Sequence, residues 1–159
     1  MILDSQQIEV KLFYEEKISS GGVTRIIVYT DEDGKKKKEE QEKHLADKKA
    51  SGEAISPEDQ LSIKTLTTQW KVITWGDQTL ITGKCEKYNP AGIQDLDYIK
   101  YRDMRLKKSL VGWDIKNDKG QDIPCVEQYI DALPSHVVAA LLDKYDQLVL
   151  GNDEEETKN

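Results

Sequence analysis

The sequence predicts an α+β fold, with a mainly helical domain, an N-terminal β-hairpin and a charged, flexible loop between them. Two segments, Gly92–Trp113 and Ser135–Leu150, repeat apolar residues at the three- and four-residue spacing of an amphipathic helix. Gln7–Tyr14 instead alternates apolar and polar residues, as a half-buried strand does. From Asp31 to Asp59 apolar residues are almost absent, which favours a solvated segment over a packed one.

The composition fits one domain with solvated segments. Of the 159 residues, 37% are hydrophobic and 33% are charged, with a mean hydropathy of -0.68. The net charge of -7 argues against general nucleic-acid binding, whose affinity comes from neutralising phosphates. No apolar run approaches the ~18 residues that span a membrane, and the start, MILDSQQIEV, does not resemble a signal peptide. The two distant cysteines, Cys85 and Cys125, form no metal motif and are expected to be thiols.

The first thirty residues predict a hairpin. The strand at Gln7–Tyr14 is followed by Val23–Thr30, which is rich in β-branched and aromatic residues. Gly21 and Gly22 lie between them and tolerate the positive φ of a tight turn. Because an isolated hairpin is only marginally stable in water, it must pack on another element or pair with other strands.

The charged segment has two interpretations. Lys and Glu interleave over Lys35–Lys49, which is compatible with a solvated helix or with disorder, and we favour disorder or a frayed helix. The four lysines of Lys35–Lys38 are followed at once by acidic residues that cancel their field. Ser56 is then expected to cap a short helix that has Pro57 at its first position.

The next segment predicts an extended stretch, Gln69–Ile73, followed by a helix over Trp75–Tyr88. Thr74 and Asp77 have the spacing of a near capping box at the start of this helix. After a loop comes the predicted central helix, Gly92–Trp113. Its apolar stripe consists of Leu96, Ile99, Leu106, Leu110 and Trp113, and its basic face of Lys100, Arg102, Arg105, Lys107 and Lys108.

The last third predicts a turn and two helices. Asp118–Gly120 is a tight turn, Val126–Leu133 is a short helix, and Ser135–Leu150 is an amphipathic helix that Gly151 ends. The predicted organisation is therefore a hairpin at 1–30, a charged linker or loop at 31–60, a helical domain at 61–150 and a disordered acidic tail at 151–159.

No catalytic, cofactor-binding or metal-binding residue is predicted. His136 has no accompanying nucleophile motif and is expected at the surface, and His44 is expected to be solvated. Asp95, Asp97 and Asp103 lack the turn and the glycine of a calcium loop. The segment Asn117–Asp122 loosely resembles such a loop but has no bidentate glutamate at the required spacing, so it is expected to be a turn.

The sequence does predict residues that bind a partner protein. Trp113 is expected in the core, whereas Trp70 and Trp75 lie beside a break in the pattern and could belong either to the core or to a contact surface. The basic face of the central helix is expected to meet water, an acidic partner or, in a third and weaker hypothesis, nucleic acid. The predicted partner-binding residues are Trp70, Trp75, Lys100, Arg102, Arg105 and Lys108.

The segment from Thr67 to Leu148 resembles small proteins encoded among the tail genes of tailed bacteriophages, usually described as tail assembly chaperones or tail-module proteins. The shared pattern is a helix that ends in basic residues and LVGWD, a DKGQDIP turn, and a final helix with IDALPSHV at its start. The residues that match are Arg105, Leu106, Leu110, Gly112, Trp113, Asp114, Gly120, Pro124, Ile130, Leu133, Pro134, Val138, Leu142 and Tyr145. The first sixty residues lie outside this pattern.

The resemblance implies a non-enzymatic function without a cofactor. A tail assembly chaperone would hold apolar helices of a tape-measure or tail-tube protein in the host cytoplasm until the tail assembles. The alternative is a structural virion protein of the tail, neck or capsid, whose hairpin contacts neighbouring subunits by strand addition. Self-association is possible in either case, and neither nucleic acid nor a membrane is an expected partner.

Overall fold

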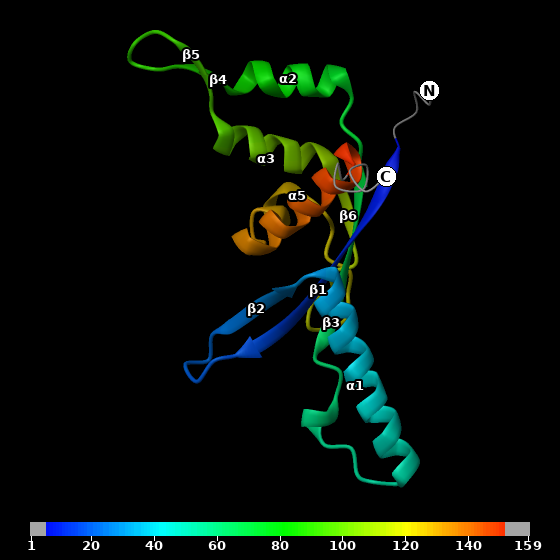
Figure 1. Ribbon diagram of the computed structural model, residues 1–159. Coiled ribbons are helices and arrows are strands. Elements are labelled where there is room, and N and C mark those ends of the chain that lie inside the picture. Colours follow the sequence, from blue (N-terminus) through cyan, green and yellow to red (C-terminus); the bar gives the residue numbers. More distant parts are fainter. Residues whose placement is uncertain (1–5, 152–159) are drawn as a thin grey trace. The chain divides into compact units, whose positions relative to one another are not determined.

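The computed structural model describes residues 6–151. In this range the fold is mixed α+β, with five α-helices and a four-stranded antiparallel sheet of strand order β2-β1-β3-β6 (Figure 1). A second, two-stranded sheet pairs β4 with β5. Helices hold 46% and strands 27% of the residues, so the description as mainly helical understates the sheet. Most of the predicted acidic tail, residues 152–159, lies outside the described range.

The chain divides into two compact units that are not consecutive in sequence. The first unit contains residues 1–10, 68–133 and 142–159, and the second contains residues 11–67 and 134–141. Three elements continue from one unit into the other: β1 (Gln7–Ile18), β3 (Ile63–Lys71) and α5 (Ser135–Leu150).

The predicted N-terminal hairpin is confirmed, with a longer first strand. β1 pairs antiparallel with β2 (Thr24–Tyr29), so that residues 15–18 belong to the strand and not to the turn. The predicted alternation holds as far as Leu12, after which Phe13 and Glu15, on the other face, are also buried. Both faces are covered there because Phe13 lies directly against Gly34 of the following helix.

Three turns of the chain share one geometry. In each, the N–H of the first residue donates to the carbonyl of the fifth, and the N–H of the fourth donates to the carbonyl of the first, all at 2.9 Å. The fourth residue is a glycine with φ of 74–75°, as in a three-residue hairpin loop with a left-handed glycine. The three turns are Ser19–Val23, Asn89–Ile93 and Asn117–Gln121.

The charged segment forms a helix, α1 (Asp31–Ser51), so our preference for disorder is wrong and the solvated-helix alternative is confirmed. Thr30 accepts a hydrogen bond from the Asp33 N–H at 3.2 Å, and Gly52 ends the helix in the left-handed conformation. Acidic residues fill the first turn and lysines the last, as the helix dipole favours. Gly34 is the only buried residue of α1, so caps and charges, and not an apolar face, specify this helix.

The chain then passes through the predicted Ser56-capped turn, a 3-10 helix at Pro57–Asp59 called η1, and enters β3. α2 (Trp75–Cys85) begins at Thr74, as predicted, with the Thr74 side chain accepting from the Asp77 N–H. It is shorter than predicted because residues 86–88 become β4 (Glu86–Tyr88), which pairs with β5 (Gln94–Leu96).

The predicted central helix is the largest error. Only α3 (Tyr98–Ser109) is helical, because Asp97 caps it and Leu110–Trp113 forms β6, which pairs with β3. The predicted stripe therefore breaks up: Leu106 is buried as expected, whereas Ile99 is 85% exposed. Trp113 is half-buried in a strand, and its Nε1 donates to the carbonyl of Ile123 at 2.6 Å.

The end of the described chain follows the prediction. α4 (Glu127–Ile130) is the short helix, with four residues in place of the predicted Val126–Leu133, and α5 covers the predicted range and ends at Gly151 with φ of 75°. In the first unit, Trp70 of β3 stacks on Tyr145 of α5, with ring centroids 4.8 Å apart. The other buried hydrophobic residues of the first unit are Val10, Ile81, Cys85, Leu106, Leu110, Ile130 and Leu142, and those of the second are Leu12, Phe13, Ile63, Leu66, Val137 and Leu141.

Candidate partner-binding surface

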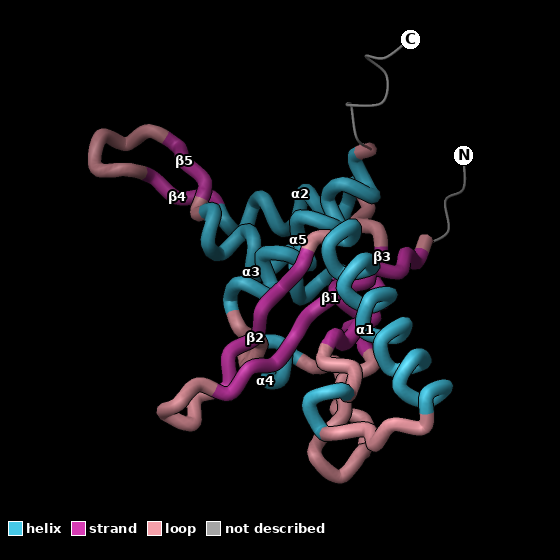
Figure 2. The backbone as a smooth tube through the Cα atoms, turned by 60° about the horizontal axis from the view of Figure 1, so that its bottom comes forward, coloured by secondary structure: helices cyan, strands magenta, loops and turns pink. Residues whose placement is uncertain are grey.

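α2 and α3 form an antiparallel helical hairpin within the first unit, and the β4–β5 strands extend from its closed end (Figure 2). At the opposite, open end, an ion pair between Lys108 and Asp77 at 3.2 Å links the end of α3 to the start of α2. Gln78 donates to the Tyr101 hydroxyl at 2.6 Å between the helices. These contacts connect the two helices, so that their outer faces form one surface.

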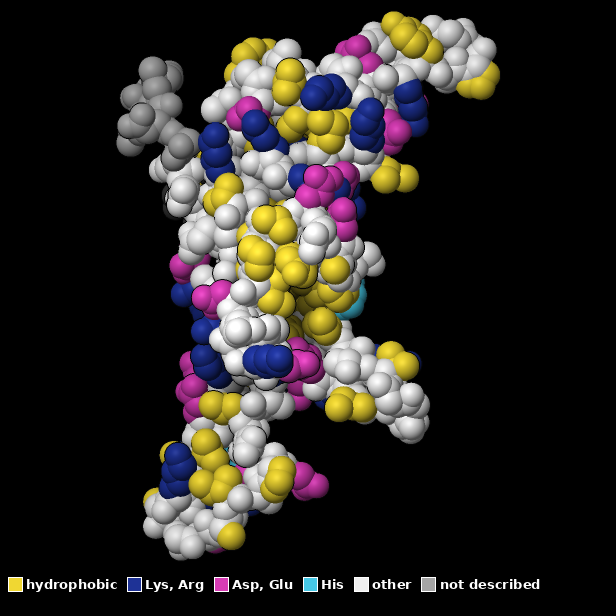
Figure 3. Space-filling model, turned by 180° about the vertical axis from the view of Figure 1, so that it is seen from behind, with side chains coloured by type: hydrophobic (Ala, Val, Ile, Leu, Met, Phe, Trp, Pro, Cys, Tyr) yellow, Lys and Arg dark blue, Asp and Glu magenta, His cyan; other side chains and the backbone are white. Residues whose placement is uncertain are grey.

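This α2–α3 surface, the exposed side chains of residues 75–109, carries six of the sixteen exposed large hydrophobic residues of the described chain. Trp75 is 84% and Ile99 is 85% exposed. Figure 3 shows apolar and basic side chains alternating along this part of the molecule, with further apolar groups on the projecting β4–β5 hairpin. The exposed large hydrophobic residues are Trp75, Leu80, Tyr88, Ile93, Tyr98 and Ile99.

The charges of the α2–α3 surface are unevenly compensated. Residues 75–109 hold seven basic and five acidic residues, a net charge of +2 in a chain of net charge -7. Four of the five acidic residues have partners within residues 75–109, because each accepts a hydrogen bond from this segment or forms an ion pair with one of its lysines. They are Asp77, Asp95, Asp97 and Asp103. Four cations have no ion pair within the described part of the chain: Lys84, Lys87, Lys100 and Arg102.

The structure brings most of the predicted partner-binding residues onto this surface. Trp75, Lys100 and Arg102 are exposed. Lys108 is also exposed, although its ammonium group is paired with Asp77. The sequence missed Tyr88 and Ile93 because it did not predict the β4–β5 strands. It missed Leu80 and Tyr98 because periodicity did not show which faces of the two helices are exposed.

Two of the predicted residues are not available at the surface. Trp70 is fully buried, so its interpretation as a contact anchor is wrong and the core alternative is correct. Arg105 is only partly exposed, because both of its terminal nitrogens donate to Asp146 of α5 and its guanidinium lies over the ring of Tyr145. Burial is the largest single influence on Arg105 and opposes its charged form, but the hydrogen bond to Asp146 and the electrostatic attraction of Asp146, Tyr101 and Tyr145 together outweigh it and raise the pKa of Arg105.

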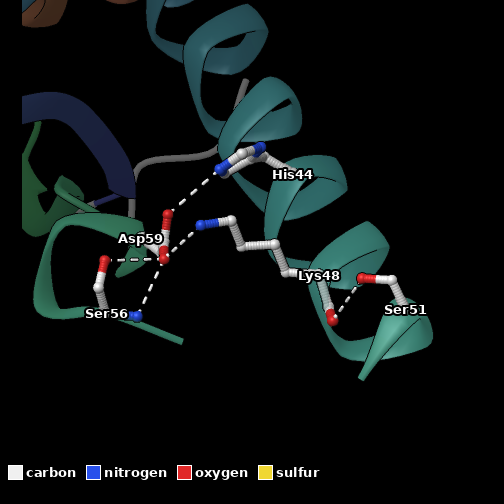
Figure 4. A network of polar contacts seen from close by, with 5 residues as sticks. All are labelled: His44, Lys48, Ser51, Ser56 and Asp59. Atoms are coloured by element: carbon white, nitrogen blue, oxygen red, sulfur yellow. Dashed lines mark hydrogen bonds and ion pairs between the residues drawn. The ribbon is translucent and has the colours of Figure 1, made fainter. Parts of the chain in front are cut away.

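A second group of polar residues lies in the second unit, at a pocket of about 270 Å³ that is lined by residues of α1 and of η1 and its cap. Asp59 there accepts hydrogen bonds from Lys48 at 2.7 Å and from the Ser56 hydroxyl at 2.8 Å, and its other oxygen lies 3.2 Å from His44 Nε2 (Figure 4). A nucleophilic serine would donate to the histidine, whereas Ser56 donates to the carboxylate. The network therefore fastens α1 to η1, and we assign it no chemistry.

The remaining polar residues of interest have structural contacts. His136 is exposed and its Nε2 lies 2.8 Å from the carbonyl of Ile26. Asp97 accepts from the Lys100 N–H at 3.1 Å as the N-cap of α3. Residues 6–151 contain no cluster of three histidine, cysteine or carboxylate groups that could hold a metal ion. None of the helices in that range is both long and apolar enough to cross a membrane.

Comparisons with protein-family models, with curated proteins and with solved structures find no match to this chain.

Proposed function

We propose that this protein is a non-enzymatic assembly factor of a bacteriophage tail, which binds a partner protein such as the tape-measure or tail-tube protein through the α2–α3 surface. The observation that carries the proposal is the exposure of six large apolar side chains within residues 75–99. Large apolar patches mark protein-binding surfaces, and an exposed aromatic residue such as Trp75 is typical of the residues that dominate binding energy.

The charges support a partner with acidic groups. The four unpaired cations of the α2–α3 surface lie among its exposed apolar residues, so an acidic and partly apolar partner would complement both properties. Nucleic acid is a less favoured partner, because the chain as a whole is strongly acidic.

A binding experiment with paired variants tests this proposal. The chain is co-expressed with the neighbouring genes of its native operon, and the retained proteins are identified after affinity purification. Replacing Trp75 and Ile99 together by serine should lower retention by about tenfold or more, since anchors of this kind dominate binding. Both side chains are exposed, so the thermal unfolding midpoint should hardly change.

The matched control is Ile55→Ser, which removes an exposed apolar side chain from the second unit. This variant should retain the partner as well as the wild type does. If the Trp75/Ile99 variant also retains the partner fully, the α2–α3 surface is not the binding site.

A second candidate function is a structural virion protein that contacts its neighbours through the N-terminal hairpin. It is favoured by the position of β2 at the edge of the four-stranded sheet, where an added strand can pair. Mass spectrometry of purified virions distinguishes the two functions. An assembly factor should be absent from the mature particle, and a structural protein should be present in many copies.

A further inference from the structure

The outward edge of β2 directs backbone groups of alternate residues away from β1. The Ser19 N–H donates to the Val23 carbonyl at 2.9 Å, which sets the hydrogen-bonding phase of the β1–β2 ladder. In an antiparallel pair, hydrogen-bonded and non-hydrogen-bonded residues alternate. Counting from the turn, Arg25, Ile27 and Tyr29 bond to β1. Thr24, Ile26 and Val28 direct their N–H and C=O groups away from β1.

One of these outward groups is covered by a side chain. His136, from the first turn of α5, places its Nε2 2.8 Å from the Ile26 carbonyl, and both residues belong to the second unit. A carbonyl oxygen only accepts hydrogen bonds, so Nε2 carries the proton and donates. The contact occupies the central acceptor of the outward edge.

The sequence of β2 offers few of the features that usually protect an edge strand. Edge strands are commonly protected by lysines, prolines or bulges, whereas TRIIVY contains one charge, Arg25, and no proline. The sequence of β2 also allows it to pair with β2 of a second copy of the chain. If two copies pair antiparallel with Ile26 opposite Ile26, then Arg25 faces Ile27 and Thr24 faces Val28, so no like charges meet.

We propose that the outward edge of β2 is a strand-addition site for β2 of a second copy of this chain, and that His136 holds the site closed. Opening requires that the exposed imidazole release the Ile26 carbonyl. The α2–α3 surface takes no part in this pairing, so the result is independent of the proposed assembly-factor function, whereas the structural virion alternative uses the same edge.

The oligomeric state of His136 variants tests the proposal. Sedimentation over a range of protein concentrations should show a monomer for the wild type and a concentration-dependent dimer for His136→Ala. His136→Gln keeps a side-chain N–H donor and should behave as the wild type. A wild-type dimer, or a His136→Ala variant that stays monomeric with an unchanged circular dichroism spectrum, would overturn the proposal.

A proline in β2 shows whether the dimer uses this edge. Thr24 is exposed and its N–H points outward, so Thr24→Pro should block strand addition and leave the β1–β2 ladder intact. Adding Thr24→Pro to His136→Ala should restore the monomer. In the His136→Ala dimer, the amides of Ile26 and Val28 should exchange with solvent more slowly than in the wild type. A dimer that persists with Thr24→Pro uses another surface and contradicts the inference.

Discussion

The Trp70 side chain shows how single residues hold the first unit together. Its Nε1 donates to the Thr68 hydroxyl at 2.7 Å, and that hydroxyl donates to the carbonyl of Val10 at 2.8 Å. Trp70 and Thr68 are fully buried, and their polar atoms are satisfied by each other and by the backbone. The indole ring also stacks on Tyr145, whose hydroxyl donates to the carbonyl of Lys71 at 3.2 Å. The residue thus links β1, β3 and α5.

Replacing Trp70 should therefore cost much of the stability of the protein. Trp70→Ala is expected to lower the free energy of unfolding by about 3–5 kcal/mol, as other large-to-small substitutions of buried aromatics do. Trp70→Phe keeps a ring on Tyr145 but loses the hydrogen bond to Thr68, so its loss should be smaller. Urea unfolding followed by circular dichroism measures both values. Equal stability of Trp70→Ala and the wild type would contradict the buried position.

Asp59 gives a prediction about pH. Hydrogen bonds from Lys48 and from Ser56 hold the pKa of the Asp59 carboxyl well below its usual range. A carboxyl with a lowered folded-state pKa stabilises the fold above its unfolded-state pKa of about 4. That contribution is lost as the pH falls through the lower folded-state pKa. The contact between α1 and η1 should therefore stay intact through neutral and mildly acidic pH.

A titration of the Asp59 carboxyl carbon by nuclear magnetic resonance measures this pKa directly. In Asp59→Asn the carboxylate is absent at every pH, and the amides at the C-terminal end of α1 should exchange faster with solvent at neutral pH. A carboxyl pKa at the ordinary aspartate value would show that the network does not form in solution.

At the scale of the elements, α1 and α2 are specified by different features. α1 has a capping threonine, an acidic first turn and a basic last turn, and its single buried residue is Gly34. α2 is also capped by a threonine, but it buries Ile81 and Cys85. Both helices contain glycine, which destabilises a helix by about 1 kcal/mol relative to alanine unless the position requires it.

Gly34 of α1 and Gly83 of α2 are expected to respond in opposite directions to alanine. A Cβ on Gly34 would lie 2.4 Å from Phe13 Cβ, so Gly34→Ala should destabilise the protein by about 1–3 kcal/mol through overpacking. A Cβ on Gly83 would meet no atom of another element within 4 Å, so Gly83→Ala should stabilise α2 by about 0.5–1 kcal/mol. Thermal unfolding of the two variants provides the comparison. Equal effects would show that Phe13 does not pack against α1.

At the scale of the whole molecule, the chain connectivity ties the two units together. β1, β3 and α5 each begin in one unit and end in the other, so neither unit is a separate stretch of sequence joined by a linker. A strand or helix cannot lose half its length without disturbing the rest, which favours cooperative unfolding.

We therefore expect a single unfolding transition. All three tryptophans lie in the first unit, so tryptophan fluorescence reports on that unit alone. The far-ultraviolet circular dichroism signal includes α1 of the second unit. The two probes should give the same urea midpoint, and two separate midpoints would show that the units unfold independently.

The sequence alone determined those features that depend on neighbouring residues. The N-terminal hairpin, the cap at Thr74, the turn at Asp118–Gly120 and the last helix were predicted because short-range periodicity and turn chemistry specify them. The interleaved charges of Lys35–Lys49 also predicted a solvated helix as one alternative for α1, although the preference for disorder was wrong. These parts needed no information about distant contacts.

Only the tertiary structure decided the rest. Leu110–Trp113 continues a helical pattern in sequence, yet it becomes β6 because its backbone pairs with β3 about forty residues earlier. The same pairing, together with the β4–β5 strands, leaves Ile99 exposed and creates the α2–α3 surface. Trp70 is buried and Trp75 is exposed for a similar reason. Periodicity gives the spacing of side chains along an element, but long-range packing determines which face is covered.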